Sequence, residues 1–242
     1  MIYAIDKRLH AYFEGSAFSN GLTITLASGN NVRQSVLPVL RQILAGKSII
    51  HVGCADHLQL IDQKRAKGVW VHDQLLQVAT RCLGIDINVQ AVAYLKEKLG
   101  YQDIIVHDLT SAELPASLVS QSWDFMFMGD MLEHLDNPVA FLRQVHGLYK
   151  DRVQRLLISV PNAFSVQNFM FMLNNQECIN TDHRYWFSIF TLAKLLVLSG
   201  FTPCFYTLAD RSPAIAPNDP LTRQMMERSF INQDTIIMGS DF

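Results

Sequence analysis

The stretch "KSIIHVGCADH" at residues 47–57 is an apolar run that passes directly into a turn. Uninterrupted apolar residues over this length favour a buried strand. Gly53 follows the strand, and a glycine lets the backbone approach a ligand closely. The sequence therefore predicts a strand that ends in a ligand-binding loop.

Further apolar runs recur along the chain and alternate with helical patterns. The expected strands cover residues 47–53, 81–87, 103–109, 123–130, 155–161, 201–208 and 234–240. One helix begins after Asn88 and ends at Gly100, a second begins at the "DNP" of 136–138, and a third covers 190–200. Strands that are apolar on both faces and alternate with helices indicate a parallel sheet covered on both sides.

The last strand follows a loop with three prolines (Pro213, Pro217 and Pro220) and no strong helix, so we expect it to run antiparallel. The fold class predicted is α/β: a Rossmann-like, doubly wound, mostly parallel sheet of seven strands. No repeat or linker interrupts the sequence. We therefore expect a single domain over 1–242 that begins with a helical or strand extension at 1–46.

Composition narrows the class of protein. The net charge is −2 and basic residues occur only in short bursts, which argues against a nucleic-acid partner. No apolar run reaches the roughly 18 residues of a membrane span. The four cysteines are far apart and include no C-x-x-C pair, so we expect a protein of the reducing cytoplasm. The sequence is compatible with a homo-oligomer.

Acidic residues stand at the ends of successive predicted strands. They are Asp86, Asp108 and Asp130. In an open α/β sheet, ligands bind beyond the carboxyl ends of the strands. A carboxylate there can accept hydrogen bonds from both ribose hydroxyls. The G-x-G-x-x-G of a pyrophosphate site is missing, so a nucleoside without a pyrophosphate is the implied ligand.

Five stretches together resemble the class I S-adenosylmethionine (SAM)-dependent methyltransferases, of the group that includes the ubiquinone-pathway enzymes. They are "IIHVGCADH", "CLGIDINVQAVAYL", "WDFMFMGDMLEHLDNPVAFLRQV", "LLISVPN" and "HRYWFSIFTLAKLLVLSGF". They follow in the family's order and cover roughly residues 47–208. The resemblance implies an enzyme that transfers a methyl group from SAM to a small-molecule or glycan-like acceptor and produces S-adenosylhomocysteine.

The resemblance also implies site residues. SAM would contact the first loop, then the residues that follow the next three strands: Gly53, Cys54, Ala55, Asp56, His57, Asp86, Ile87, Asp108, Leu109, Asp130 and Met131. Residues 162–186 fall where the family has a substrate-covering insertion, rich here in Phe, Met and Asn. We expect them to form a lid, with Tyr185 and Trp186 binding substrate.

The first loop departs from the family's pattern. His51 replaces an acidic residue, and Ala55 and His57 replace glycines. These changes motivate an alternative: a degenerate methyltransferase fold that binds SAM or a partner without catalysis. A nicotinamide-dependent reductase is disfavoured, since the glycine fingerprint is missing.

His183 and His134 are the candidate catalytic residues. His183 enters from the predicted lid and is the better candidate for a general base, which an acceptor hydroxyl would need. The histidines show no local spacing typical of metal ligands, so no metal is expected. His72 is expected at the surface or at a helix cap.

Overall fold

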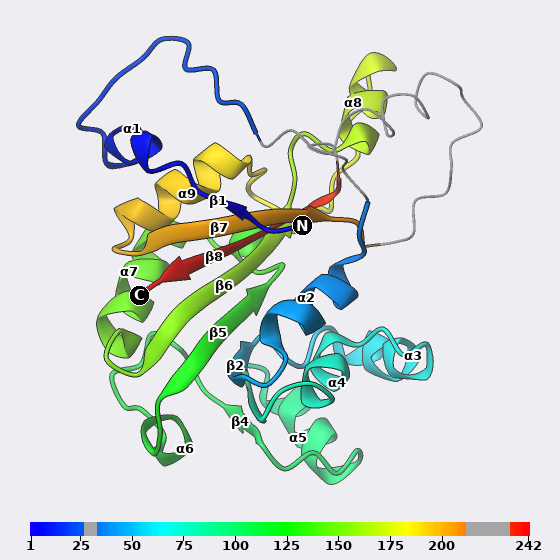
Figure 1. Ribbon diagram of the computed structural model, residues 1–242. Coiled ribbons are helices and arrows are strands. Elements are labelled where there is room, and N and C mark those ends of the chain that lie inside the picture. Colours follow the sequence, from blue (N-terminus) through cyan, green and yellow to red (C-terminus); the bar gives the residue numbers. More distant parts are fainter. Residues whose placement is uncertain (27–32, 212–232) are drawn as a thin grey trace. The chain divides into compact units, whose positions relative to one another are not determined.

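The computed structural model describes residues 1–26, 33–211 and 233–242 (Figure 1). The predicted proline-containing loop and residues 27–32 of the predicted extension lie outside this part of the chain. Eight strands form one mixed sheet in the order β1-β7-β8-β6-β5-β2-β3-β4. Their bounds are β1 Tyr3–Ala4, β2 Ser48–Val52, β3 Arg81–Asp86, β4 Ile104–Val106, β5 Trp123–Gly129, β6 Val153–Pro161, β7 Thr202–Ala209 and β8 Thr235–Asp241.

Helices alternate with most of these strands. The α-helices are α1 His10–Glu14, α2 Val36–Leu44, α3 Ile61–Ala66, α4 Val71–Leu76, α5 Val89–Glu97, α6 Ala116–Val119, α7 Pro138–Tyr149, α8 Val166–Leu173 and α9 Ile189–Leu198. Short 3₁₀ helices are η1 Lys7–Leu9, η2 Leu58–Leu60 and η3 Leu132–His134. The α/β class and the predicted helices after Asn88, at 138 and near 190 are confirmed.

The contacts of the chain divide it into two units. Unit 1 comprises Met1–Val36, Asp130–Ala140 and Ile158–Asp241. Unit 2 comprises Leu37–Gly129, Phe141–Leu157 and Phe242. The single domain expected over 1–242 stays a prediction.

Unit 2 contains four parallel strands. Strand β2 pairs with both β3 and β5, and β3 pairs with β4. Apolar side chains bury β2 on both faces, and Ile49 and Ile50 in this strand are fully buried. Helix α5 begins at Asn88, whose side chain accepts a hydrogen bond from Ala91 N at 3.0 Å. The register brings the carboxyl ends of β2, β3 and β4 to the same edge of the sheet.

Unit 1 contains the antiparallel part of the sheet. Strand β8 runs antiparallel to β7, which confirms the prediction for the last strand. The count of seven strands was wrong, because β1 pairs antiparallel with β7 and adds an eighth. Its two residues are too few to show a period of two, and the pairing is stabilised by contacts distant in sequence. The ring of Tyr3 stacks on that of Tyr206 at 5.6 Å between centroids.

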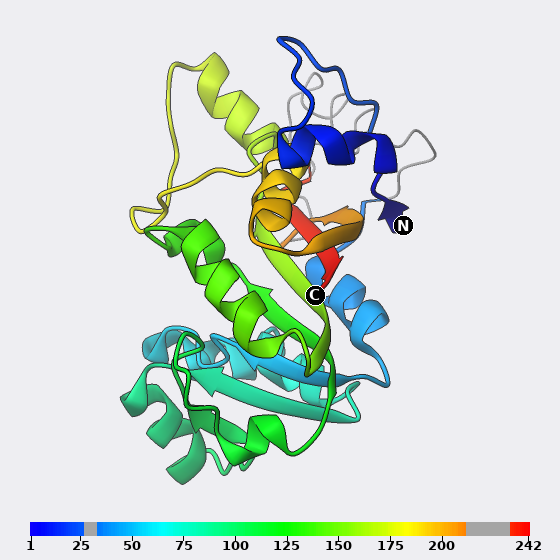
Figure 2. The same cartoon turned by 90° about the vertical axis from the view of Figure 1, so that its left-hand side faces the viewer.

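The N-terminal segment packs on helix α9 (Figure 2). The ring of Phe13 in α1 lies 5.1 Å from that of Phe190, and Lys194 donates to Tyr12 O at 3.0 Å. Helix α9 begins with a capping box between Ser188 and Thr191. A cavity of about 560 Å³, lined mainly by apolar residues of the N-terminal segment, α9 and β7, lies in this unit.

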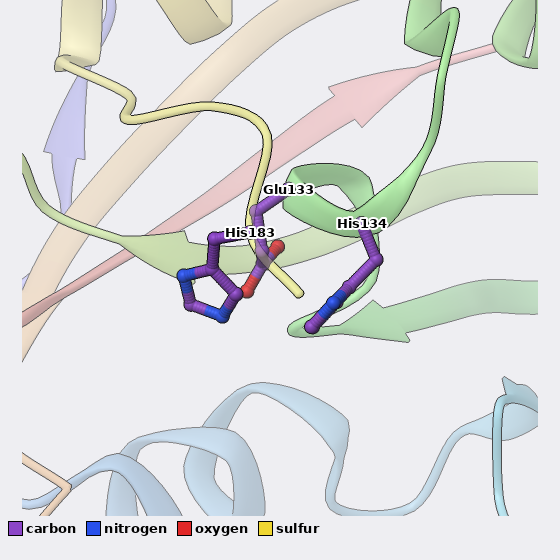
Figure 3. Close-up of side chains that lie close together, drawn as sticks. All are labelled: Glu133, His134 and His183. Carbon is purple, nitrogen blue, oxygen red and sulfur yellow. The ribbon is translucent and has the colours of Figure 1, made fainter. Parts of the chain in front are cut away.

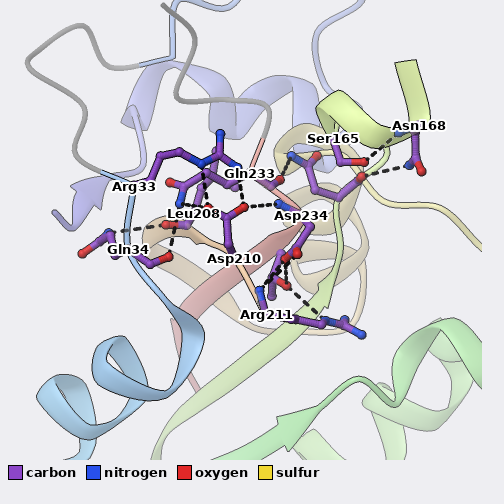
Figure 4. A network of polar contacts seen from close by, with 11 residues as sticks. Arg33, Gln34, Ser165, Asn168, Leu208, Asp210, Arg211, Gln233 and Asp234 are labelled. Atoms are coloured by element: carbon purple, nitrogen blue, oxygen red, sulfur yellow. Dashed lines mark hydrogen bonds and ion pairs between the residues drawn. The ribbon is translucent and has the colours of Figure 1, made fainter. Parts of the chain in front are cut away.

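A network of polar contacts joins three separate segments of unit 1 (Figure 4). Asp210 is 5% exposed and accepts from Arg33 through both carboxylate oxygens, at 2.9 and 2.6 Å. It also accepts from Gln233 Nε2 at 3.1 Å and from Asp234 N at 3.3 Å. A buried carboxylate is tolerated when its lone pairs are occupied in this way. The network therefore fixes the ends of β7 and β8 beside residues 33 and 34.

Gly84 in the middle of β3 has no room for a side chain. A Cβ there would lie 2.8 Å from Cys54 Sγ and 2.9 Å from His72 Cε1. We expect Gly84→Ala to lower the free energy of unfolding by about 1–3 kcal/mol, because these buried neighbours must shift. Urea denaturation followed by circular dichroism measures the change.

Gly147→Ala is the matched control. Gly147 lies within α7, and a Cβ there meets nothing within 4 Å. Alanine favours a helix over glycine, so this variant should gain up to about 1 kcal/mol. Equal stability of the two variants would show that the contacts around Gly84 do not constrain β3.

Candidate functional site

The loop after β2 begins at Gly53, which has a φ of +67°. Gly53 N donates to Ile85 O at 2.8 Å, so the first residue of the loop is fixed against the end of β3. Apart from its two chain neighbours, no described residue has an atom within 4 Å of the position that a Cβ would take. This left-handed backbone strains any residue with a side chain, and the missing Cβ leaves open space beside the loop.

Asp86, the last residue of β3, connects this loop to the next one. Its Oδ2 accepts from Ala55 N at 3.1 Å, and its Oδ1 accepts from Asn88 N at 2.9 Å. Each carboxylate oxygen offers about two acceptor sites, so both keep capacity for a further donor. The carboxylate is half-buried and held by the backbone at the carboxyl edge of the sheet.

Asp108 follows β4 at the same edge. It is exposed, and its Oδ1 accepts from Thr110 N at 2.9 Å and from Thr110 Oγ1 at 2.7 Å. These hydrogen bonds lower the pKa of the Asp108 carboxyl. Leu109 beside it is buried, whereas Ile87 after β3 is 73% exposed. The edge thus presents two fixed carboxylates together with exposed apolar surface.

The other predicted residues of the loop differ in what they expose. The side chains of Cys54 and Ala55 are buried, so only their backbone could face a ligand. Asp56 has a φ of +58° and is ion-paired with Lys64. His57 is exposed. The Asp56 carboxylate therefore has a cationic partner within the chain, the Lys64 ammonium group.

His51 and His72 form a buried pair. His51 is 5% exposed and His72 is fully buried, and their Nδ1 atoms lie 3.0 Å apart. One Nδ1–H must donate to the lone pair of the other ring, which requires at least one neutral histidine. The prediction that His72 lies at the surface was wrong, because β2 and α4 bring the two rings together in the core. Because His51 is buried against His72, its ring does not serve as a charged contact to a ligand.

Burial lowers the pKa values of both rings. The pKa of His72 falls to about 4, and that of His51 falls well below 6.5, where the charge of His72 would oppose it further. Each ring is therefore neutral in the folded protein at neutral pH. The pair is a structural element of unit 2 that replaces the acidic residue usual at this position.

In unit 1, Asp130 directly follows the last residue of β5. Its backbone has a φ of +50°, and its N–H donates to Ser159 O at 2.9 Å. Its Oδ1 accepts from Arg211 Nη2 at 2.6 Å. The cationic group that faces Asp130 in this unit is thus the guanidinium of Arg211. Met131 beside it is half-buried.

Three side chains gather in unit 1 (Figure 3). Glu133 and His134 lie on η3, and His183 comes from the predicted lid. One donor atom from each lies within 4.8 Å of the others. The ring centroids of His134 and His183 are 4.7 Å apart. The two predicted catalytic histidines are thus neighbours.

Glu133 stands with Asp130 and His134 after the predicted strand 123–130, but the sequence assigned it no role in the site. It is fully buried, and burial raises the pKa of its carboxyl to about 8. The signal that could have found it is its position: it directly precedes His134 in a turn that follows an apolar strand. Nothing in the local pattern shows that this glutamate points inward, because that depends on the segment that covers it.

That segment is residues 180–186, which is fastened to η3 by hydrogen bonds. Arg184 N donates to Glu133 O at 2.7 Å, and Arg184 Nη1 donates to His134 O at 2.5 Å. Tyr185 Oη donates to Asp136 O at 2.9 Å. Trp186 lines a separate cavity of about 360 Å³ with residues of α8. Of the two predicted substrate residues, Tyr185 therefore hydrogen-bonds to the backbone of unit 1, and Trp186 lines a cavity.

A family model described as a methyltransferase domain matches residues 30–204. The chain belongs to this family. A search of curated proteins finds no match.

Solved structures share the fold. A SAM-dependent methyltransferase from Thermotoga maritima, titled a possible histamine N-methyltransferase, is 14% identical; the match covers 85% of this chain and 86% of that one, with a TM-score of 0.53. The small RNA methyltransferase HEN1 is also 14% identical, with 92% of this chain and 27% of that one covered and a TM-score of 0.51. Magnesium protoporphyrin IX methyltransferase from Synechocystis with bound S-adenosylhomocysteine is 16% identical, with 85% and 80% covered and a TM-score of 0.49.

The predicted family, the enzyme class and the cofactor are confirmed: the chain is a SAM-dependent methyltransferase. Among the residues that the structure describes, no helix is long and apolar enough to cross a membrane. A cytoplasmic location stays a prediction.

The histidine pair generates a pH dependence of stability. In the unfolded chain His72 binds a proton near pH 6.5, whereas the folded protein resists protonation down to about pH 4. The unfolded state therefore binds more protons in this window, and stability falls as pH falls from 6.5 to 4. We expect His72 to contribute up to about 3 kcal/mol of this loss. Urea denaturation at several pH values measures the slope.

His72→Gln should reduce that slope, since glutamine cannot be protonated. His57→Gln, which changes an exposed histidine of the same unit, should leave it unchanged. A slope in His72→Gln equal to that of the unmodified protein would contradict the buried neutral pair.

Proposed function

We propose that this methyltransferase transfers the methyl group of SAM to a small-molecule or glycan-like acceptor and releases S-adenosylhomocysteine. The proposal rests on one observation above all. Gly53 and Asp86 stand together at the carboxyl edge of the sheet in unit 2, and Asp86 is oriented by two backbone N–H groups.

The residues of unit 2 fit a nucleoside. The open space beside Gly53 would let the ligand approach the backbone, and the Asp86 carboxylate has acceptor capacity for two ribose hydroxyls. Asp108 and Leu109 would flank the adenine, with exposed Ile87 as an apolar contact. Cys54, Ala55, Asp56 and His57 would contribute through the loop backbone. These assignments, and those of Asp130 and Met131, are part of the proposal.

SAM supplies an already activated methyl group, so the chain has mainly to bind and align the reactants. Asp86 would position the ribose, and Gly53 would permit close contact with the loop. His134 and His183 in unit 1 are the candidate catalytic residues for an acceptor whose oxygen must lose a proton. Asp86 is held by two backbone N–H groups, and Gly53 has the left-handed backbone that a ligand-binding loop needs. An active enzyme is therefore favoured over a degenerate fold without catalysis.

The acceptor is proposed from the composition of the predicted lid. Trp186 borders the 360 Å³ cavity with Phe171 and Met172, which suits a flat or apolar group. The structural neighbours include a possible histamine N-methyltransferase and a small RNA methyltransferase. At these identities they show the fold alone. The net charge of −2 favours a small acceptor over a nucleic acid.

Titration calorimetry with SAM and with S-adenosylhomocysteine, without added metal, tests the cofactor site. We expect binding of both ligands in the micromolar range. Asp86→Ala should weaken binding by at least tenfold, about 1.4 kcal/mol, because it removes the proposed acceptor of the ribose hydroxyls.

Asp103→Ala is the matched control. Asp103 precedes β4 at the opposite edge of the same strands and pairs with Arg81. Its loss should leave affinity unchanged. Equal affinities of the Asp86 and Asp103 variants would refute the ribose assignment, and no binding at millimolar SAM would favour the degenerate alternative.

A further inference from the structure

Glu133 carries two buried oxygens without a partner. Its side chain is fully buried, and neither Oε1 nor Oε2 makes a hydrogen bond within the described part of the chain. Nδ1 of His183 is likewise buried and unpartnered. A buried polar atom without a partner costs about 1–3 kcal/mol, and more when the group is charged. Buried polar atoms without a partner call for an explanation, and a bound ion is one that fits a carboxylate with both oxygens unpartnered.

The donor atoms form a set that suits a metal ion. The groups are one carboxylate and two imidazoles, and one atom of each lies within 4.8 Å of the others. Ligands of a zinc ion lie about 2.0–2.2 Å from it, so two of them can be separated by at most about 4.4 Å. The three atoms exceed that limit by at most about 0.4 Å, so binding an ion requires them to move slightly closer. Figure 3 shows the rings and the carboxylate turned toward one region.

The backbone that carries these groups is held in place. His183 lies one residue before Arg184, whose N–H and guanidinium both bind carbonyl groups of η3. Arg184 is also ion-paired with Asp136 at 2.7 Å. Two segments 50 residues apart in sequence are thereby fixed against each other before any ligand arrives. Such preorganisation lowers the cost of binding.

We propose that Glu133, His134 and His183 bind a divalent transition-metal ion, with Zn²⁺ the best match to two imidazoles and a carboxylate. The sequence predicts no metal because the histidines lack the local spacing of metal ligands. Folding brings the three groups together by closing residues 180–186 over η3. Three protein ligands leave a coordination position open for water or another oxygen.

The metal site goes beyond the proposed methyl transfer, and binding can be measured without SAM or acceptor. Only the role of the ion in the reaction rests on the proposed function. His134 and His183 would then coordinate the ion through their lone pairs, and an acceptor oxygen at the open position would lose its proton more readily.

The test titrates the full chain, stripped with a chelator and dialysed, with ZnCl₂ by calorimetry and with CoCl₂ by visible absorption. We expect one ion per chain with micromolar or tighter affinity, and a Co²⁺ spectrum typical of bound imidazole. Glu133→Gln and His183→Gln should each weaken binding by more than about 100-fold, the upper end of the loss caused by removing an outer partner of a metal ligand. Glutamine is nearly isosteric with Glu133, and His183 is only half-buried, so the two variants give independent chances of a folded protein.

His10→Gln is the control. His10 pairs with Glu14 at 2.9 Å in α1, a second histidine and carboxylate pair of unit 1. This variant should bind the ion as the unmodified protein does. Failure to bind Zn²⁺ and Co²⁺ at one ion per chain, or unchanged affinity in both cluster variants, would overturn the proposal. Because SAM titration is carried out without metal, that result leaves the methyltransferase proposal untouched.

Discussion

The candidate cofactor site depends on the carboxylate of Asp86 and the two backbone N–H groups that it accepts from. One belongs to the loop after β2 and the other to the start of α5, so a single side chain fixes both connections. The parallel register of β2 and β3 makes this possible, since it ends both strands at one edge. Gly53 then needs its left-handed backbone to turn the loop away from the strand.

Buried ionisable groups in the two units are accommodated in different ways. His51 and His72 share one hydrogen bond through their Nδ1 atoms and stay neutral, whereas His72 Nε2 has no partner among the described residues. Asp210 accepts hydrogen bonds from Arg33 through both carboxylate oxygens and from Gln233 Nε2. Glu133 has neither arrangement, because both of its carboxylate oxygens lack partners within the described residues. A buried carboxylate with both oxygens unpartnered is therefore a candidate ligand-binding group.

Much of the fold was predictable because local sequence patterns determine where its strands and helices lie. Apolar runs marked seven of the eight strands, and the asparagine cap marked the start of α5. The position of the acidic residues was predictable for the same reason, since the carboxyl ends of parallel strands lie at the same edge of the sheet. Strand β1 was missed because two residues carry no periodicity. Glu133 and the position of His72 were missed because burial of a side chain is set by whichever distant segment covers it.

The sequence by itself determined the α/β class, the methyltransferase family and the residues that stand at the ends of the strands. These follow from periodicity, capping and motif order, which act over a few neighbouring residues. The tertiary structure alone decided that His51 faces His72 and that His183 lies against Glu133 and His134. Such contacts join segments far apart in the chain, and their energy depends on desolvation and hydrogen bonds that no local pattern encodes.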